Sequence, residues 1–259
     1  MKLIPSLRSS IGFFTIIPVN DRDFEKSGIY LMWIPYTLAG LLSLLAFYLL
    51  SYITDIYISA IISLIIIPLI LGFQNIDALA DFGDGIMKRG SPEERFRVMK
   101  SPDVGSGGIF ALFAVYSISI VSIFSINPKY IGQALLFSQL NSVIWMVSIM
   151  FRNSTREQGF AYYFKEITDK NMFCISNMVP VLIIFVLLFQ SLVILILISF
   201  LFSLFFRLYA GKIFEKINGD IIGAGGELGR MFSLILINIP VLIYPINPHF
   251  LFLHFQDFL

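Results

Sequence analysis

The sequence predicts an all-α, polytopic membrane helix bundle of about seven transmembrane helices, with the N-terminus inside the cell and the C-terminus outside. Of its 259 residues, 57% are hydrophobic and only 14% are charged, and the mean hydropathy is +0.84. Soluble domains contain about a quarter charged residues. Apolar runs recur at the length that a bilayer requires of a helix, and the basic residues gather on one side of them. The chain is therefore expected to lie in a lipid bilayer.

Hydropathy divides the apolar part of the chain into seven segments, each long enough or almost long enough to span a membrane. The segment at the C-terminal end is the shortest, and Pro240 is expected to kink it. The fifth and sixth segments almost touch, which predicts a tight turn near Gln190 and Ser191. The predicted spans are residues 31–52, 56–73, 108–126, 130–150, 172–189, 191–209 and 231–245.

The distribution of charge fixes the predicted orientation. If the seven spans alternate, 17 of the 18 Lys and Arg residues fall on one side and only Lys129 falls on the other. The positive-inside rule makes the crowded side cytoplasmic. All acidic residues except Asp55 and Asp257 fall on the same side, which that rule does not demand. A site that uses charges of both signs is therefore expected on the cytoplasmic face of a cell-membrane protein.

The chain is predicted to form one membrane-embedded domain over residues 1–259. Residues 1–30 combine basic and apolar residues, interrupted by Pro5 and Gly12, and are interpreted as an interfacial segment rather than a signal peptide. Residues 75–107 form a cytoplasmic Asp-rich motif and loop, and residues 207–230 form a second motif rich in glycine and acids. With a net charge of +1 the chain has no global basic field, so no nucleic-acid partner is expected.

The Asp-rich motif reads NIDALADFGDGIMKRG. If the second helix continues past Phe73, then Asp77, Asp81 and Asp84 lie on one helical face, because their spacings are four and three. Three carboxylates on one face repel each other, and a divalent cation such as Mg²⁺ would remove that cost. Gly83 and Gly85 would let a phosphate approach the backbone. The competing interpretation is a solvated helix end whose acids pair with Lys88 and Arg89.

The second motif reads RLYAGKIFEKINGDIIGAGGELGR. Asp220 and Glu227 are seven residues apart and share a face if a helix runs between them. Together with Arg207 and Lys212 they suit a second set of metal ligands or a phosphate cradle. The alternative is close helix packing through small residues, which explains the glycines well and the acids poorly.

The loop between the two motifs contains a predicted helix start, with Ser91 as the capping residue and Pro92 in the first turn. Lys100 could hold phosphate or could anchor the loop at the membrane surface. The following glycine-rich run, which includes Gly105, opens the third span. Its exposed N–H groups are a natural anion site.

Four stretches together resemble the cobalamin synthase family, the integral membrane adenosylcobinamide-GDP ribazoletransferases. They are SIGFFTIIPV (10–19), DALADFGDGIM (77–87), RFRVMKSPDVGSGG (95–108) and NGDIIGAGGEL (218–228). The second is the most specific, since it looks like the family's D-x-L-A-D-x-x-D-G element. Two departures concern the acids: Ser101 stands where the family has an acid, with Asp103 two places on, and Arg230 stands where another acid is expected after Glu227.

The resemblance implies the final assembly step of cobalamin biosynthesis. A hydroxyl of α-ribazole, or of its 5′-phosphate, would attack the phosphoryl group attached to cobinamide in adenosylcobinamide-GDP, and GMP would leave. Displacement on a diphosphate needs charge neutralisation, which a metal supplies. The predicted Mg²⁺ ligands are Asp77, Asp81, Asp84, Asp220 and Glu227. Asp84 and Asp81 are the predicted catalytic residues, with Asp84 favoured as the base, and the predicted phosphate or substrate contacts are Arg207, Lys212, Lys100, Gly85 and Gly105.

Two other functions stay open at this point. A CDP-alcohol-type phospholipid phosphotransferase would share the Mg²⁺-dependent chemistry, although its usual motif has a longer gap containing an Ala-Arg pair. A membrane transporter would place acids at mid-membrane in several spans, whereas here they cluster at one face. The sequence also leaves open whether the chain acts as a homodimer.

Overall fold

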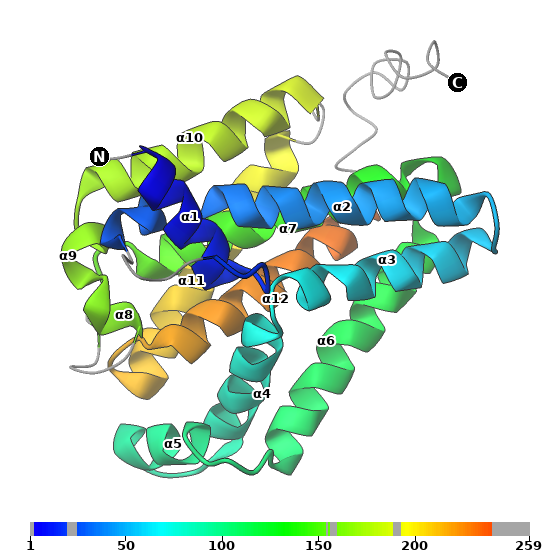
Figure 1. The fold of residues 1–259 in the computed structure, drawn as a ribbon. Coiled ribbons are helices and arrows are strands. Elements are labelled where there is room, and N and C mark those ends of the chain that lie inside the picture. Colours follow the sequence, from blue (N-terminus) through cyan, green and yellow to red (C-terminus); the bar gives the residue numbers. More distant parts are fainter. Residues whose placement is uncertain (1–2, 20–24, 154, 156–159, 189–192, 240–259) are drawn as a thin grey trace.

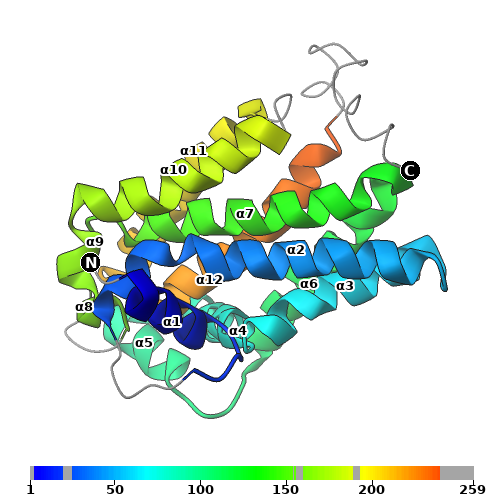
Figure 2. The same cartoon turned by 45° about the horizontal axis from the view of Figure 1, so that its top comes forward.

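A computed structural model describes residues 3–19, 25–153, 155, 160–188 and 193–239. Within these ranges every regular element is a helix, and consecutive long helices run between two ends of a bundle (Figures 1 and 2). The long helices are α2 (Trp33–Ser51), α3 (Ile56–Ile70), α6 (Ser106–Ser125), α7 (Ile131–Met150), α10 (Asn171–Leu188), α11 (Val193–Phe214) and α12 (Gly219–Ile237). The shorter ones are α1 (Leu3–Phe14), η2 (Lys26–Leu31), α4 (Gln74–Met87), α5 (Pro92–Met99), η3 (Pro128–Tyr130), α8 (Phe160–Tyr163) and α9 (Lys165–Thr168).

Helix α7 lies at the centre of the bundle. It packs against α2, α10, α11 and α12, and 94% of its apolar stretch is buried inside the protein. The helices around it leave large apolar side chains exposed, including Leu49 on α2, Phe113 on α6 and Phe205 on α11. An apolar surface of this kind fits contact with lipid, so the protein is a membrane protein whose central helix is shielded from the bilayer.

In the part of the chain that the structure describes, four helices are long and apolar enough to cross a membrane: α2, α6, α7 with the preceding η3, and α11. A fifth span is added if α3 and α4 are taken as one bent span. The count is lower than the predicted seven because α3 and the apolar part of α10 are short and α12 carries charges and many glycines. The predicted turn near Gln190 and the predicted kink at Pro240 lie outside the described residues, as does the end of the seventh predicted span.

The second predicted span does not continue straight into the aspartate stretch, which corrects the sequence interpretation. Helix α3 ends at Ile70, and α4 leaves it at an angle of 90°. Gly72 and Phe73 both have positive φ values, 71° and 60°, which an α-helix does not accommodate. Helix α4 therefore lies outside the long membrane helices, beside the first half of α6 (Figure 1).

Two further boundaries differ from the prediction. Helix α12 begins at Gly219, twelve residues before the predicted seventh span, because a hydropathy threshold cannot detect a helix whose first turns hold glycine and acids. Helix α11 continues to Phe214, past the predicted end at residue 209, since Arg207 and Lys212 interrupt the apolar run without breaking the helix. The second motif is therefore split between the end of α11 and the first half of α12.

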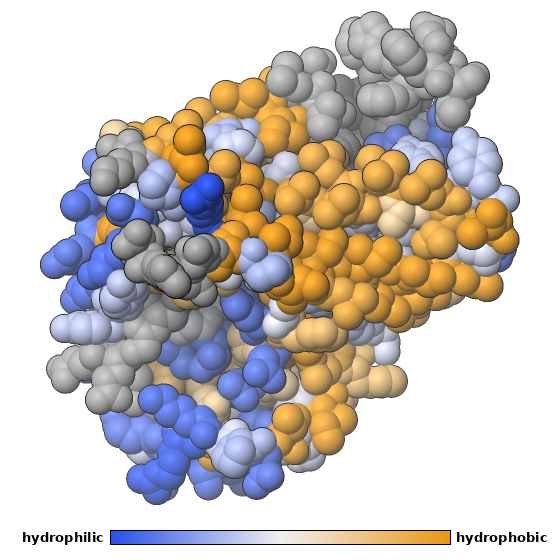
Figure 3. Space-filling model, in the orientation of Figure 1, coloured by the Kyte–Doolittle hydropathy of each residue, from blue (hydrophilic) through white to orange (hydrophobic). Residues whose placement is uncertain are grey.

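Polar and apolar side chains separate along the bundle. In Figure 3 hydrophilic residues gather over the end that holds α5, α8 and α9, while hydrophobic residues cover α2 and α3. Helix α1 lies at the polar end, where it buries Ser6, Ser9 and Ser10 and exposes Leu3 and Ile4. A helix that hides serines and presents apolar side chains suits the membrane interface.

Candidate active site

The three aspartates of the first motif lie on α4 at decreasing exposure. Asp77 is exposed in the first turn, Asp81 is half-buried one turn later, and Asp84 is buried, with 8% of its surface accessible. Their spacings of four and three place them on the same side of the helix, as the sequence predicts. This side of α4 faces α6 and α12.

Asp84 is fully engaged by the backbone of the neighbouring helix. Its Oδ2 accepts a hydrogen bond from the N–H of Gly105 at 2.7 Å, and its Oδ1 accepts one from the N–H of Gly108 at 2.8 Å. A Cβ atom at Gly105 would lie 2.4 Å from the Asp84 carboxylate, so a glycine is needed for this contact. The anion at the glycine-rich start of α6 is therefore Asp84 itself, which joins α4 to α6.

Asp220 approaches the same group from α12. It lies in the first turn of that helix, where Asn218 acts as the capping residue: Asn218 Oδ1 accepts from the N–H of Ile221 at 3.0 Å. The side-chain amide of Asn218 also donates to Asp220 Oδ2 at 2.6 Å. Gly223, one turn later, brings α12 against α4, since a Cβ there would lie 2.6 Å from the Cβ of Ala78.

The electrostatics show that these acids share one region, which we call the acid cluster: Asp77, Asp81 and Asp220, with Asp84 beside them. Burial and, to a smaller extent, the negative charges of Asp220, Asp77 and Asp84 together raise the pKa of Asp81 to about 7. The side-chain amide of Asn218 and the positive charge of Lys100 lie close to Asp220. The cluster holds more negative charge than its surroundings compensate.

The acid cluster is not arranged as a complete metal cage. Within the described part of the chain, no group of three or more His, Cys, Asp or Glu side chains is placed to hold a metal ion. Mg²⁺ does not require such a group, because it keeps several waters and commonly takes one or two carboxylates together with substrate phosphates. Carboxylates from two helices, whose mutual repulsion raises the pKa of Asp81, supply the oxygen donors and the excess charge that such an ion needs.

Glu227 does not join the other acids. It lies two turns further along α12, is 1% exposed, and forms an ion pair with Arg230 inside the bundle. Its second oxygen accepts a hydrogen bond from Tyr116 of α6 at 3.2 Å. The structure therefore separates the two acids of the second motif, and the predicted metal role of Glu227 remains a prediction without a neighbouring ligand.

Of the residues predicted to contact phosphate, some are occupied by other contacts within the protein and others are exposed. Arg207 donates to Asn153 Oδ1 and to the carbonyl of Ser148, so its guanidinium is occupied by the end of α7. Gly85 is covered by Met99 and Phe214, which leaves no space beside it for a phosphate. Lys100 is exposed at the end of α5, and its positive charge lies near Asp220. Lys212 is exposed in the last turn of α11, and no recorded contact ties it to the acid cluster.

The glycines of the second motif pack helices together, as the alternative interpretation proposed. A Cβ at Gly225 would lie 2.1 Å from Ile149, and a Cβ at Gly229 would lie 2.6 Å from Trp145, both on α7. The glycines therefore allow α12 to lie close to α7 and α4, while the acids of the same motif serve other purposes.

Two supporting contacts are not recognisable in the sequence. Arg95 of α5 donates to the carbonyls of Gly85 and Ile86, which caps the end of α4. Tyr36 of α2 and Asn75 of α4 form a buried hydrogen bond at 3.2–3.3 Å, which holds the start of α4. An arginine in a polar loop and a tyrosine in an apolar span do not by themselves indicate, in the sequence, that they contact another helix. Asn75, a polar residue two positions before the first aspartate, is the one weak indication in the sequence that the start of α4 makes such a contact.

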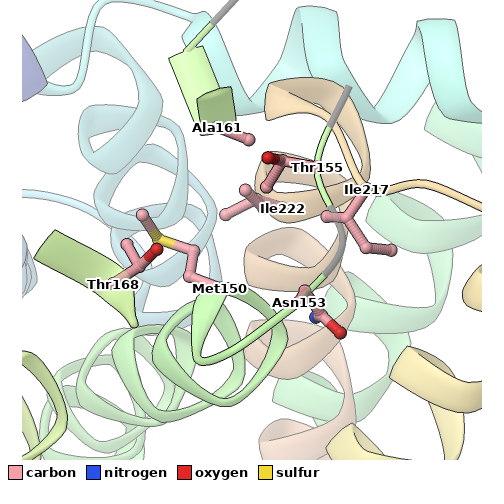
Figure 4. A pocket seen from close by; sticks show the side chains of 7 residues that line it. All are labelled: Met150, Asn153, Thr155, Ala161, Thr168, Ile217 and Ile222. Atoms are coloured by element: carbon pink, nitrogen blue, oxygen red, sulfur yellow. The ribbon is translucent and has the colours of Figure 1, made fainter. Parts of the chain in front are cut away.

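A small pocket opens at the polar end, but it does not mark the site. It is a shallow hollow beside the start of α12 with no room for a ligand, and its lining side chains are mostly apolar (Figure 4). None of the predicted site residues lines it, so the acid cluster is the better candidate for the chemistry. The lining residues are Met150, Asn153, Thr155, Ala161, Thr168, Ile217 and Ile222.

Comparison with known proteins gives a consistent result. The family model described as cobalamin-5-phosphate synthase matches residues 6–238. A curated relative from Picrophilus torridus is 33% identical over 246 residues, covering 89% of this chain and 96% of its own, and is named adenosylcobinamide-GDP ribazoletransferase. Relatives with the same name from Thermoplasma acidophilum and Pyrococcus furiosus are each 30% identical and cover 91% and 90% of this chain and 94% and 99% of their own. No solved structure matches the chain.

Proposed function

Because the chain belongs to the cobalamin-5-phosphate synthase family, we propose that its acid cluster binds Mg²⁺ together with the diphosphate of the donor substrate. The protein is a transferase of cobalamin synthesis that joins adenosylcobinamide-GDP to α-ribazole or its 5′-phosphate, with GMP as the other product. One observation carries the proposal: carboxylates of α4 and α12 gather at the polar end of the bundle, and their mutual repulsion helps to raise the pKa of Asp81 to about 7. A bound cation would relieve that repulsion.

The residues of the acid cluster and those beside it have different proposed roles. Asp77, Asp81 and Asp220 provide the oxygen atoms that face the ion, and Lys100 beside Asp220 contributes a positive charge for a phosphate oxygen. When bound, Mg²⁺ supplies charge neutralisation on the diphosphate. Asp84 holds the start of α6 through the N–H groups of Gly105 and Gly108, which positions the wall of the site.

The proton of the attacking hydroxyl needs an acceptor. Both carboxylate oxygens of Asp84 already accept hydrogen bonds from backbone N–H groups, and the side chain is buried. Asp81 is half-buried, and without a bound ion its burial and the negative charges around it raise its pKa to about 7. We therefore place the proton acceptor at the carboxylate oxygen of Asp81 that does not face the ion, rather than at Asp84. Asp84 remains important for the shape of the site.

The proposal extends to the membrane. Seven crossings, with the N-terminus and the acid cluster on the cytoplasmic side of the cell membrane, are supported by the alternation of the seven long helices between two ends of the bundle (Figures 1 and 2). The loops at the end with the acid cluster also carry most of the Lys and Arg residues. A cytoplasmic site would meet its nucleotide substrates without transport.

The direct test is an assay of GMP release. Purified protein in detergent or vesicles is incubated with adenosylcobinamide-GDP and α-ribazole, with Mg²⁺ or with EDTA, and the Asp81→Asn variant is assayed in parallel. Mg²⁺-dependent GMP release that is lost in Asp81→Asn supports the proposal. Release that survives EDTA or the substitution contradicts the metal assignment. CDP-diacylglycerol with an alcohol serves as the competing substrate pair, and its turnover would favour the phospholipid phosphotransferase alternative.

A further inference from the structure

A buried ion pair lies beneath the acid cluster, in the interior of the bundle. Glu227 and Arg230 of α12 are 1% and 2% exposed and contact each other through Oε1 and Nη2. The other carboxylate oxygen, Oε2, accepts a hydrogen bond from the hydroxyl of Tyr116 on α6 at 3.2 Å. Both oxygens of Glu227 are therefore used, one within α12 and one between α12 and α6.

Stability alone does not account for this pair. Burying two charges costs several kcal/mol per ion, and apolar residues of similar volume are often at least as stable. Among the residues that the structure describes, Nε and Nη1 of Arg230 have no hydrogen-bond partner. The side-chain amide of Gln139 on α7 is also buried without one. Polar groups that are retained at such a cost point to a role in specificity or function.

The contacts of α12 around the ion pair indicate the role of Glu227. At several points helix α12 approaches α4 and α7 through glycines, of which Gly223 lies against Ala78 and Gly229 against Trp145. Glycines allow a close approach, but they provide no protruding side chain that would fix the rotation of the helix. A hydrogen bond to a buried charge is directional, and buried polar contacts can set the register between helices. The bond between Glu227 and Tyr116 fixes the side of α12 that faces α6.

Helix α6 is in turn fixed to α4 by the contacts of Asp84 with Gly105 and Gly108. The three helices thus form a closed triangle: α12 is held to α6 by Glu227, α6 is held to α4 by Asp84, and α4 packs directly on α12. Asp81 and Asp220 lie at the contact between α4 and α12. A rotation of α12 would move Asp220 away from Asp77 and Asp81.

We propose that Glu227 is a positioning residue for the transfer reaction: through Tyr116 it sets the rotation of α12 and directs Asp220 towards the aspartates of α4. Arg230 compensates the buried charge of Glu227 and leaves its second oxygen free for Tyr116. This inference rests on the proposed function, because Asp220 matters only if the acid cluster binds the cation and the diphosphate.

Two variants distinguish the effect of the hydrogen bond between Tyr116 and Glu227 from the effect of the charges of the Glu227–Arg230 ion pair. Tyr116→Phe removes the hydroxyl that reaches Glu227 and keeps the ion pair. The double variant Glu227→Gln with Arg230→Met removes both charges and keeps a side-chain oxygen that can accept from Tyr116. Tyr57→Phe is the matched control, because Tyr57 of α3 contacts α6 through the ring of Phe124 at the other end of the bundle.

The readouts are the Mg²⁺ concentration that gives half-maximal GMP release and, without substrates, the Mg²⁺ concentration that gives half of the metal-induced rise in melting temperature. Tyr116→Phe is expected to raise both concentrations about fivefold, the effect of losing one hydrogen bond. The double variant and Tyr57→Phe are expected to stay within about twofold of the unmodified protein.

Three results would overturn the inference. If Tyr116→Phe leaves both Mg²⁺ concentrations unchanged, the contact does not position Asp220. If the double variant loses Mg²⁺ binding while Tyr116→Phe keeps it, Glu227 is a metal ligand. If activity falls only in proportion to melting temperature, with the Mg²⁺ requirement constant, the contact is merely structural. Failure of the proposed function would look different, since the unmodified protein would then show no Mg²⁺ dependence.

Discussion

Two acids on the same face of α12 have opposite surroundings. Asp220 lies in the first turn, where it is partly accessible and joins the acid cluster from across the contact with α4. Glu227 lies about 10 Å further along the helix axis, at 1.5 Å per residue, and is enclosed in the bundle with Arg230 and Tyr116. Asp220 accepts a hydrogen bond from Asn218 and lies near other carboxylates, whereas the charge of Glu227 is compensated by Arg230 inside the bundle.

The difference shows that residue type and helical periodicity do not define a site by themselves. A residue seven positions further along a helix lies on the same face, but it is about two turns away along the helix axis. In α12 these two turns lead from the polar end of the bundle into its interior. The presence of Arg230 three residues after Glu227 decides the outcome, since an i, i+3 partner of opposite charge makes an internal pair available. Asp77, Asp81 and Asp220 have no Lys or Arg three or four residues further along the helix, and these acids gather between helices.

The largest effect is expected for the loss of a charge in the acid cluster. Asp81→Asn should lower kcat about 10²- to 10⁴-fold, because it removes the proposed proton acceptor and a ligand of the ion. Its melting temperature without metal should not fall, since the substitution removes a charge that its neighbours repel. GMP release and a thermal melt in detergent measure the two quantities.

The control for this variant is Asp169→Asn, which neutralises an exposed carboxylate after α9, near the same polar end of the bundle. It should keep both activity and melting temperature. If Asp81→Asn loses activity only because it unfolds, or if Asp169→Asn loses as much activity, the acid cluster is not the reaction centre.

The next largest effect should come from Asp84, and it should appear in stability. Asp84→Ala removes two hydrogen bonds to a charged acceptor and leaves two N–H groups at the start of α6 unsatisfied, which should cost about 2–4 kcal/mol. Denaturant unfolding in detergent would measure it. Asp84→Asn keeps one acceptor and should lose about half as much. A fully stable but inactive Asp84→Ala would instead support the original prediction that Asp84 is the base.

A smaller and reversible effect is expected from pH. The pKa of Asp81 is raised from 3.8 to about 7 in the folded protein, so the folded state retains a proton that the unfolded chain has already lost. The resulting contribution to stability is complete below pH 3.8 and is lost as the pH rises to about 7. Metal-free protein should therefore melt at lower temperature as the pH rises through this window.

Magnesium should reverse that trend, because the ion and the proton compete for the same carboxylate. The apparent Mg²⁺ affinity should increase with pH up to about 7 and then level off. Melting curves between pH 5 and pH 8.5, with and without Mg²⁺, measure both effects, and Asp81→Asn should flatten the metal-free dependence. A Mg²⁺ affinity that does not change with pH would contradict the assignment of Asp81 to the ion.

Much of the fold is readable from the sequence, because bilayer thickness fixes the length of a span. The starts of α2, α6 and α7 lie within two residues of their predicted positions. The bend between α3 and α4 was not predicted, since it depends on the φ values of Gly72 and Phe73, which apolar composition does not reveal. The early start of α12 was missed because its first turns are packed between other helices and need no lipid-facing residues.

The candidate site was predicted less completely. The spacing of the aspartates on α4 and the helix that carries Asp220 follow from periodicity. The separate roles of Asp84 and Glu227 do not, because each depends on a partner from another element: the N–H groups of α6 in one case and Tyr116 in the other. Sequence periodicity describes one helix at a time, whereas these roles arise between helices.

The smallest effect is expected at the edge of the site, where the loop after α4 enters α5. Ser91 and Glu94 form the predicted helix start as a capping box: Ser91 Oγ accepts from the N–H of Glu94 at 3.3 Å, and Glu94 accepts from the N–H of Ser91 at 2.8 Å. Ser91→Ala should cost about 1 kcal/mol of helix stability. The loss should be local, because Ser91 is exposed at the start of α5, whereas Lys100, whose charge lies near Asp220, follows the other end of that helix.

Hydrogen exchange of α5 should therefore accelerate in Ser91→Ala while kcat changes by less than about twofold. Ser101→Ala is a suitable comparison, since it removes an exposed serine just beyond the other end of the same helix. If Ser91→Ala lowers kcat as strongly as Asp81→Asn, the start of α5 is part of the reaction centre. The reaction centre would then extend beyond the residues that contact Asp81 and Asp220.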